Sequence, residues 1–136
     1  MKQVLVFGAG KSATVLIEYL LNEAAQQNWF ITVADADISL ARSKTGNHNR
    51  SHAVSFDINN ETDRRNELAK ADIVISMLPP HLHILVAKDC ILYKKNLLTA
   101  SYVDEQVKML YLGRNFELRR KDYLLQEITP DSLPDL

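Results

Sequence analysis

The sequence has little of what marks disulfide-linked, metal-cluster or membrane proteins. It contains one cysteine, Cys90, in 136 residues, which excludes an internal disulfide and a zinc site built from several thiolates. No run approaches the roughly 20 apolar residues of a membrane span, and the start lacks an apolar secretory signal, so we expect a cytoplasmic protein. The net charge of −1 gives no electrostatic reason to expect nucleic acid or an anionic membrane as a partner.

What the sequence does contain is typical of one soluble domain in which strands and helices alternate. Hydrophobic residues make up 46% and charged residues 24% of the chain, as in ordinary globular proteins. We expect strands at residues 4–7, 29–34, 52–57, 73–77 and 96–100. We expect helices at residues 11–27, 38–44, 61–69 and 81–92. Alternation of this kind predicts an α/β fold: a doubly wound, Rossmann-like parallel sheet in three α/β/α layers, with strand order 3-2-1-4-5.

The start of the chain carries the strongest functional pattern. An apolar run of strand type, Val4–Phe7, ends at the segment Gly8-Ala9-Gly10-Lys11-Ser12-Ala13, where a helical pattern begins. In a dinucleotide fingerprint Gly8 permits the tight turn, Gly10 leaves room for a pyrophosphate, and Ala13 lets helix and strand pack closely. The first N–H groups of the helix have no internal partner and attract phosphate. The segment predicts a dinucleotide site; the alternative is a glycine-rich turn that only packs.

An acidic residue follows the second expected strand at the spacing that such a site needs. Asp35 lies 35 − 10 = 25 positions after Gly10, near the usual spacing of about 20 residues. Its carboxylate can accept hydrogen bonds from the adenosine ribose and would repel a 2′-phosphate, which favours NAD over NADP. Arg42 and Lys44 follow on a short helix, from which they could reach such a phosphate. The alternative role for Asp35 or Asp37 is to cap that helix.

Further candidate residues stand where other strands end, because ligands of doubly wound sheets bind beyond the carboxyl ends of the strands. Asp57 and Ile58 follow the third strand and are expected beside the adenine, although a turn-forming role suits Asp57 equally. The remaining candidates follow the fourth and fifth strands, on the nicotinamide and substrate side: Leu78, Pro79, Ser101 and Tyr102. The alternative for Ser101 and Tyr102 is a helix cap and a half-buried ring.

Other polar and apolar positions are given structural roles. His81 and His83 are two residues apart on a helix and do not share a face, so we expect no metal site. Cys90 is interpreted as a small core residue. The mixed charges of helix 61–69, including Arg64, are interpreted as a solvated surface. In helix 11–27 the expected buried stripe is Val15, Leu16, Tyr19, Leu20 and Ala24.

Taken together, these segments resemble the NAD(P)-binding domain of the saccharopine dehydrogenase (saccharopine reductase) family. The resemblance covers residues 1 to about 107. It rests on Val6–Ser12, Val33–Asp37, Asp57–Asn59, Ala71–Pro79, His83–Cys90 and Thr99–Val103. It implies that the turn formed by Gly8, Ala9, Gly10, Lys11 and Ser12 holds the pyrophosphate. It also places Asp35 and Ala36 at the ribose, and the Leu78-Pro79 and Ser101-Tyr102 segments beside the nicotinamide and substrate.

The family pattern fades after Val107. Members of the family continue into a larger substrate domain, and its characteristic entry is not found in residues 108–136. We therefore expect a dinucleotide-binding domain at 1–107 and a divergent helix and tail at 108–136, with one amphipathic helix at Glu117–Ile128. The fifth strand is then expected to form an open edge of the sheet, which favours a homodimer.

The resemblance implies an oxidoreductase of lysine metabolism that moves a hydride between nicotinamide and the secondary amine of saccharopine. Because we expect no substrate domain in this sequence, no catalytic residue is assigned, and the chain alone is expected to bind NAD or NADP without turnover. Two alternatives stay open. One is a nucleotide-sensing regulatory module, and the other is a domain that binds S-adenosylmethionine through Asp35 and Asp57.

Overall fold

The computed structural model describes residues 1–99 and 126–128, and the structural statements below concern those residues. The strands are β1 (Lys2–Phe7), β2 (Trp29–Asp35), β3 (Ser51–Ser55), β4 (Ile73–Ser76), β5 (Asn96–Thr99) and β6 (Gln126–Ile128). The helices are a short 3-10 turn, η1 (Lys11–Ala13), followed by α1 (Thr14–Gln27), α2 (Ile38–Thr45), α3 (Glu61–Ala69) and α4 (Pro80–Leu92). Each of the nine strands and helices expected between residues 4 and 100 is therefore found, with bounds that differ by few residues.

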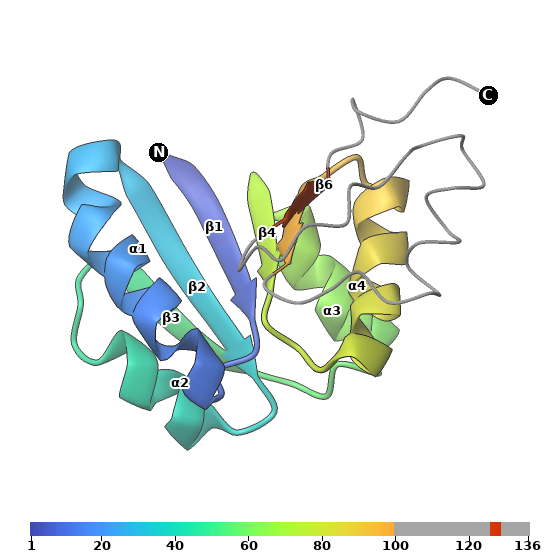
Figure 1. Cartoon of the computed structure of the whole chain (residues 1–136), viewed down its shortest axis with the longest axis horizontal. Helices are drawn as coiled ribbons and strands as arrows, with labels where there is room; N and C mark the ends of the chain where they lie inside the picture. Colours follow the sequence, from blue (N-terminus) through green and yellow to red (C-terminus); the bar gives the residue numbers. More distant parts are fainter. Residues whose placement is uncertain (100–125, 129–136) are drawn as a thin grey trace.

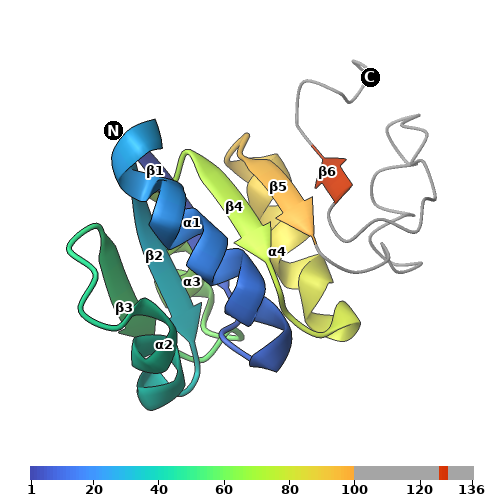
Figure 2. The same ribbon diagram turned by 60° about the vertical axis from the view of Figure 1, so that its left-hand side comes forward.

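These strands form one sheet in the order β3-β2-β1-β4-β5-β6 (Figure 1). The first five strands are parallel, which confirms the order predicted for them. Helices α1 and α2 cover one face of the sheet, and α3 and α4 cover the other (Figure 2). The fold is thus the expected three-layer, doubly wound α/β architecture.

The core consists of two apolar clusters, one on each face of the sheet. Successive residues of β1 alternate between them, as side chains of a strand must. Val4 and Val6 pack with Ile17 of α1, whereas Leu5 and Phe7 pack with the cluster under α3 and α4. Burial on both faces explains why the central strands read as continuous apolar runs.

The helices begin and end at residues suited to those positions. The Asp37 carboxylate accepts the N–H groups of Ser39 and Leu40 and caps α2, and Asn60 caps α3 through the N–H of Asp63. Helix α1 ends at Asn28 in a left-handed conformation with φ 59°. The capping role weighed for Asp35 or Asp37 therefore belongs to Asp37.

The β5 side of the sheet differs from the prediction. Residues Gln126–Ile128 form β6, antiparallel to β5, so the helix expected at Glu117–Ile128 is wrong over these three residues. Strand β5 is consequently paired on both sides and is not an edge, which removes the reason given for a homodimer. A polar and apolar mixture such as Gln-Glu-Ile carries no clear period, and its pairing depends on a partner strand distant in sequence.

Helix α1 is rotated relative to the expected stripe. Its buried residues are Ile17, Leu20, Leu21 and Ala24, while Val15 is 76% and Tyr19 57% exposed. The 3-10 turn before α1 has three residues per turn rather than 3.6, and it shifts the helix face that is buried in α1.

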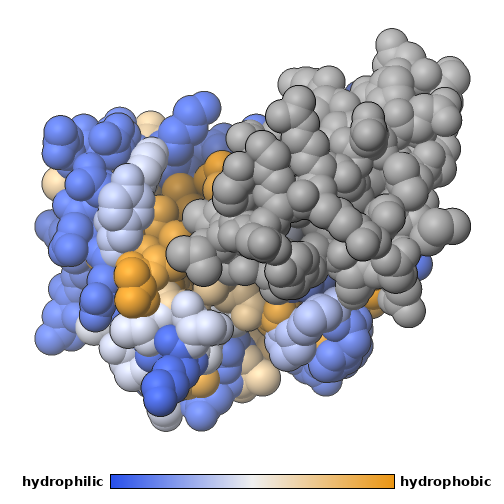
Figure 3. Space-filling model, viewed as in Figure 1, coloured by the Kyte–Doolittle hydropathy of each residue, from blue (hydrophilic) through white to orange (hydrophobic). Residues whose placement is uncertain are grey.

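In the view of Figure 3 the described surface is mainly hydrophilic, with hydrophobic residues visible beside α1. Among the described helices, none is long and apolar enough to cross a membrane.

Candidate functional site

The glycine-rich turn leaves β1 at the carboxyl end of the sheet, and Gly8 is required there by the fold itself. Its φ is +96°, a conformation that residues with a side chain rarely adopt. A Cβ on Gly8 would stand 3.1 Å from the backbone carbon and oxygen of Met77, and 3.3 Å from the Leu78 nitrogen. The Gly8 N–H also donates to Ala34 O at 2.8 Å. The turn therefore brings the ends of β1, β2 and β4 together.

Gly10 differs from Gly8 because no described neighbour requires it to be glycine. Its backbone is extended, with φ −68° and ψ 179°, and a Cβ built on it would meet no atom of the residues 1–99 and 126–128 within 4 Å. The missing side chain therefore leaves open space at the start of η1, where N–H groups lack intrahelical acceptors. Ala13 is fully buried in the core beneath α1. The turn fits a pyrophosphate: one glycine shapes the backbone and the other leaves room.

Asp35 ends β2 and ties it to this turn. Its Oδ1 accepts the Ala9 N–H at 2.9 Å, and its Oδ2 accepts the Asp37 N–H at 2.9 Å. Both carboxylate oxygens thus already accept a backbone N–H, and one of the two donors belongs to the glycine-rich turn. Ala36 is exposed beside it. Each oxygen keeps further lone-pair capacity that a ribose hydroxyl could use.

The third strand brings Asp57 and Ile58 to the same edge of the sheet. Phe56 N donates to Asp35 O at 3.3 Å, which joins the end of β3 to the end of β2. Asp57 Oδ1 accepts the Asn59 N–H at 2.9 Å, so the turn-forming role weighed for this residue is observed. Asp57 is exposed and Ile58 is half-buried.

The fourth strand ends beside the glycine-rich turn. Met77 N donates to Phe7 O at 2.8 Å, and Leu78 follows at the Gly8 contact described above. Pro79 is exposed at the start of α4. The predicted site residues from Gly8 to Pro79 therefore lie where the parallel strands β1 to β4 end and in the segments that follow them. Ser101 and Tyr102 lie outside the described residues.

Helix α4 carries a buried histidine that the sequence interpretation did not use. The His83 ring is 3% exposed, and its Nδ1 lies 2.6 Å from the hydroxyl oxygen of Ser76, which is fully buried at the end of β4. This hydrogen bond fixes the start of α4 to the strand that precedes it. His81, by contrast, is exposed. No group of three or more possible metal ligands occurs among the residues that the structure describes.

A buried ion pair joins α3 to α4, and it corrects the interpretation of Arg64 as part of a solvated surface. Arg64 is 5% and Asp89 1% exposed, and Arg64 Nε donates to Asp89 Oδ2. Arg65 Nε donates to Asp89 Oδ1 at 3.1 Å; this hydrogen bond is the main reason that the pKa of Arg65 is raised. The signal was present: Arg64 is four residues before buried Leu68, on the same helix face.

Cationic side chains occur on α2 and on the glycine-rich turn. Lys44 of α2 donates from Nζ to Thr14 Oγ1 at 2.7 Å, which joins the two helices. Arg42 is exposed on α2, and Lys11 is exposed on the glycine-rich turn. These side chains are well suited to attract a phosphorylated ligand.

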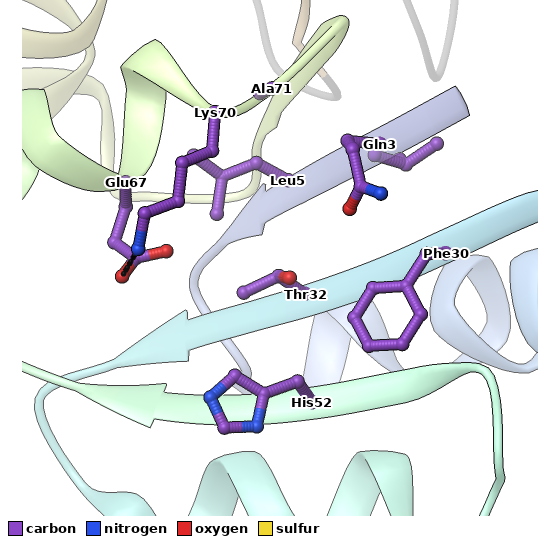
Figure 4. Close-up of a pocket in the computed structure, with 9 residues that line it drawn as sticks. Gln3, Leu5, Phe30, Thr32, His52, Glu67, Lys70 and Ala71 are labelled. Carbon is purple, nitrogen blue, oxygen red and sulfur yellow. Dashed lines mark hydrogen bonds and ion pairs between the residues drawn. The ribbon is translucent and has the colours of Figure 1, made fainter. Parts of the chain in front are cut away.

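A cavity of about 200 Å³ lies elsewhere, over the amino-terminal halves of the strands (Figure 4). Its floor includes Leu5, Thr32 and His52, and its wall is the end of α3, where Lys70 and Glu67 form an ion pair at 3.3 Å. None of its lining residues belongs to the predicted dinucleotide site. This cavity is therefore not part of the candidate site at the carboxyl ends of the strands.

Comparison with known proteins agrees with this geometry. The family model for the saccharopine dehydrogenase NADP binding domain matches residues 4–127. Mitochondrial alpha-aminoadipic semialdehyde synthase of Bos taurus is 37% identical over 110 residues, which cover 80% of this chain and 11% of that protein. Saccharopine dehydrogenase [NADP(+), L-glutamate-forming] of Pyricularia oryzae is 31% identical over 102 residues, covering 75% and 22%. The chain thus spans a small part of these relatives.

Solved structures give the same result. Apo saccharopine dehydrogenase (L-Glu forming) from Saccharomyces cerevisiae superposes with a TM-score of 0.73 and 28% identity, covering 82% of this chain and 24% of that one. A Rossmann-fold NAD(P)-binding family protein from Shigella flexneri superposes with a TM-score of 0.55 and 22% identity, covering 68% and 45%. The second likeness concerns the fold alone.

Proposed function

The chain belongs to the family of saccharopine dehydrogenase NADP-binding domains, and from this premise we propose that it binds a nicotinamide dinucleotide at the carboxyl ends of β1, β2 and β4. The observation that carries the proposal is the contrast between two glycines. Packing against Met77 accounts for Gly8, whereas no described residue within 4 Å accounts for Gly10. Space kept open beside helical N–H groups suits a pyrophosphate.

Each part of the coenzyme has a proposed place. The turn Gly8–Ser12 holds the pyrophosphate, and Asp35 with Ala36 lies at the adenosine ribose. Asp57 and Ile58 lie beside the adenine, and Leu78 and Pro79 lie toward the nicotinamide. Ser101 and Tyr102 stay predictions for the substrate side.

We propose NADP as the coenzyme, although Asp35 considered alone predicts NAD. Both oxygens of Asp35 already accept backbone N–H groups, so this carboxylate has a role in the scaffold of the turn besides any contact with the ribose. Arg42 on α2 is exposed and lies one turn after the β2–α2 loop. The names of the family and of the Pyricularia oryzae relative also refer to NADP.

We further propose that the chain supplies the cofactor half of a saccharopine dehydrogenase-like oxidoreductase of lysine metabolism. When bound, the nicotinamide accepts or donates a hydride, and the protein orients it. In this proposal the described candidate residues are all assigned to the coenzyme, and none is assigned to the substrate. The chain by itself is therefore expected to bind dinucleotide without turnover. Homodimerisation and a cytoplasmic location stay predictions.

The test is a calorimetric titration of the purified chain with NADPH, NADH and S-adenosylmethionine. We expect NADPH to bind more tightly than NADH, and Arg42→Ala to weaken NADPH about tenfold with little effect on NADH. Arg50→Ala, at the opposite end of the sheet, is the matched control. If S-adenosylmethionine binds more tightly than either dinucleotide, the chain is a domain that binds S-adenosylmethionine. If a nucleotide makes the chain dimerise and no hydride is transferred in the presence of substrate, the regulatory module is favoured. Saccharopine-dependent NADPH formation by the chain alone would contradict its expected inactivity.

A further inference from the structure

The ion pair between Arg64 and Asp89 requires an explanation beyond stability. Both side chains are almost fully buried, and removing two charges from water costs free energy that their attraction only partly returns. In other proteins, apolar side chains of similar size often replace a buried ion pair with no loss of stability. The pair therefore points to a further task that needs the geometry of a guanidinium group.

That task is visible in the second contact of Arg64. While Nε donates to Asp89, Nη1 donates to the backbone oxygen of Ile58 at 2.8 Å. Ile58 lies in the loop between β3 and α3, next to Asp57. One planar group thus joins a carboxylate on α4 to a carbonyl in this loop, which a point charge such as lysine does not reproduce.

The Asp89 end of this connection is held rigidly. Helix α4 packs against the core through Val86, Ala87 and Cys90, and its first turn is bonded to β4 through His83 and Ser76. Asp89 also accepts a hydrogen bond from Arg65. Arg64 is therefore fixed by the body of the domain, and the loop at Ile58 is fixed by Arg64.

We propose that Arg64 is a positioning residue, held by Asp89, that sets the loop 57–60 for the adenine of the dinucleotide. This inference rests on the proposed dinucleotide site. Residues that orient a binding group through hydrogen bonds affect affinity without touching the ligand. Loss of the Ile58 contact lets the loop move, so that the adenosine end of the coenzyme binds less tightly while the fold is retained.

The experiment compares Arg64→Lys with Arg65→Lys in the full chain. Lysine at position 64 keeps a positive charge near Asp89 but cannot hold Asp89 and the Ile58 carbonyl together. Lysine at position 65 leaves the contact with Ile58 in place. We expect Arg64→Lys to bind NADPH and 2′,5′-ADP about tenfold more weakly and to exchange its amide protons faster at residues 57–60. Arg65→Lys should match the wild type in both measurements.

The outcomes separate this inference from the proposed function. If the wild type binds neither ligand, the dinucleotide site itself is overturned, and this role is overturned with it. If the wild type binds and Arg64→Lys binds equally well, with unchanged exchange at 57–60, only the positioning role fails. Should Arg64→Lys not fold, Asp89→Asn keeps the side-chain size and one acceptor oxygen. Asp89→Asn is then expected to show the same local exchange and a smaller loss of affinity, and wild-type behaviour would overturn the role.

Discussion

Asp35 Oδ1 accepts a hydrogen bond from the backbone N–H of Ala9 at 2.9 Å, so the end of β2 holds the glycine-rich turn in its conformation. The second oxygen holds the N–H of Asp37 in the next loop. One carboxylate thus joins two of the loops that form the candidate site. A residue expected to contact the ribose is already part of the scaffold around it.

Replacing Asp35 by alanine should therefore affect both folding and binding. The change removes two hydrogen bonds to a charged acceptor, and bonds of this kind contribute about 1.5–3 kcal/mol each. Asp35 is partly exposed, so water can take over part of the lost hydrogen bonding. We therefore expect the unfolding free energy to fall by about 2 kcal/mol. Urea denaturation measures it, and titration with NADPH should show weaker binding.

The matched control is Asp37→Ala, which removes the cap of α2 but leaves the Asp37 N–H on Asp35. Loss of an N-cap costs about 1 kcal/mol, and the glycine-rich turn is not affected. NADPH affinity should stay near that of the wild type. Equal effects of the two substitutions on affinity would mean that the Ala9 contact has no special role.

The two glycines of the turn should respond differently to alanine. Gly8→Ala forces a side chain to φ +96° and against the Met77 backbone, and the backbone strain alone costs about 1–3 kcal/mol. Gly10→Ala has open space and an ordinary φ, so its stability should be unchanged or higher by about 0.4–1 kcal/mol. The same methyl group would occupy the proposed pyrophosphate position. Gly10→Ala should therefore keep its thermal stability and lose NADPH affinity; undiminished affinity would place the phosphates elsewhere.

The layered fold and most of the candidate site could be predicted from the sequence because their signals are local. The spacing along the sequence is enough to recognise a strand that ends at Gly8 and a carboxylate at the end of the next strand. Arg64 and Asp89 were missed because a charged residue is normally solvated, and only the packing of α3 on α4 buries them. Strand β6 was missed for a related reason, since its pairing with β5 joins residues about 30 positions apart.

The hydrogen bond between Ser76 and His83 should contribute measurably to stability. Ser76→Ala removes one partner from a buried pair 2.6 Å apart, and the histidine nitrogen cannot regain a water molecule at no cost. A loss of about 1–3 kcal/mol is expected. Ser55→Ala is the control because the Ser55 hydroxyl, which donates to Ala36 O at 2.9 Å, is exposed. Denaturation of both variants measures the difference, and equal losses would show that burial adds nothing to the Ser76 bond.

Cys90 should be unreactive in the folded chain and should make stability decrease at alkaline pH. The side chain is fully buried, and this burial raises the pKa of the thiol well above its ordinary value of 9.0. The folded state therefore keeps its proton at pH values where the unfolded chain has lost it. A thiol reagent at pH 8 should modify Cys90 only after denaturant is added.

The sign of the pH effect follows from proton binding. Below pH 9 both states carry the thiol proton, and its contribution to stability is fully present. Above pH 9 the unfolded state binds fewer protons than the folded state, so stability falls by up to about 1.4 kcal/mol per pH unit from this group. Lysines and tyrosines titrate in the same range, and Cys90→Ala separates their effect from that of the thiol. The wild type should lose stability more steeply than Cys90→Ala between pH 9 and 10.5, whereas parallel curves would show that the thiol ionises as readily in the folded protein as in the unfolded chain.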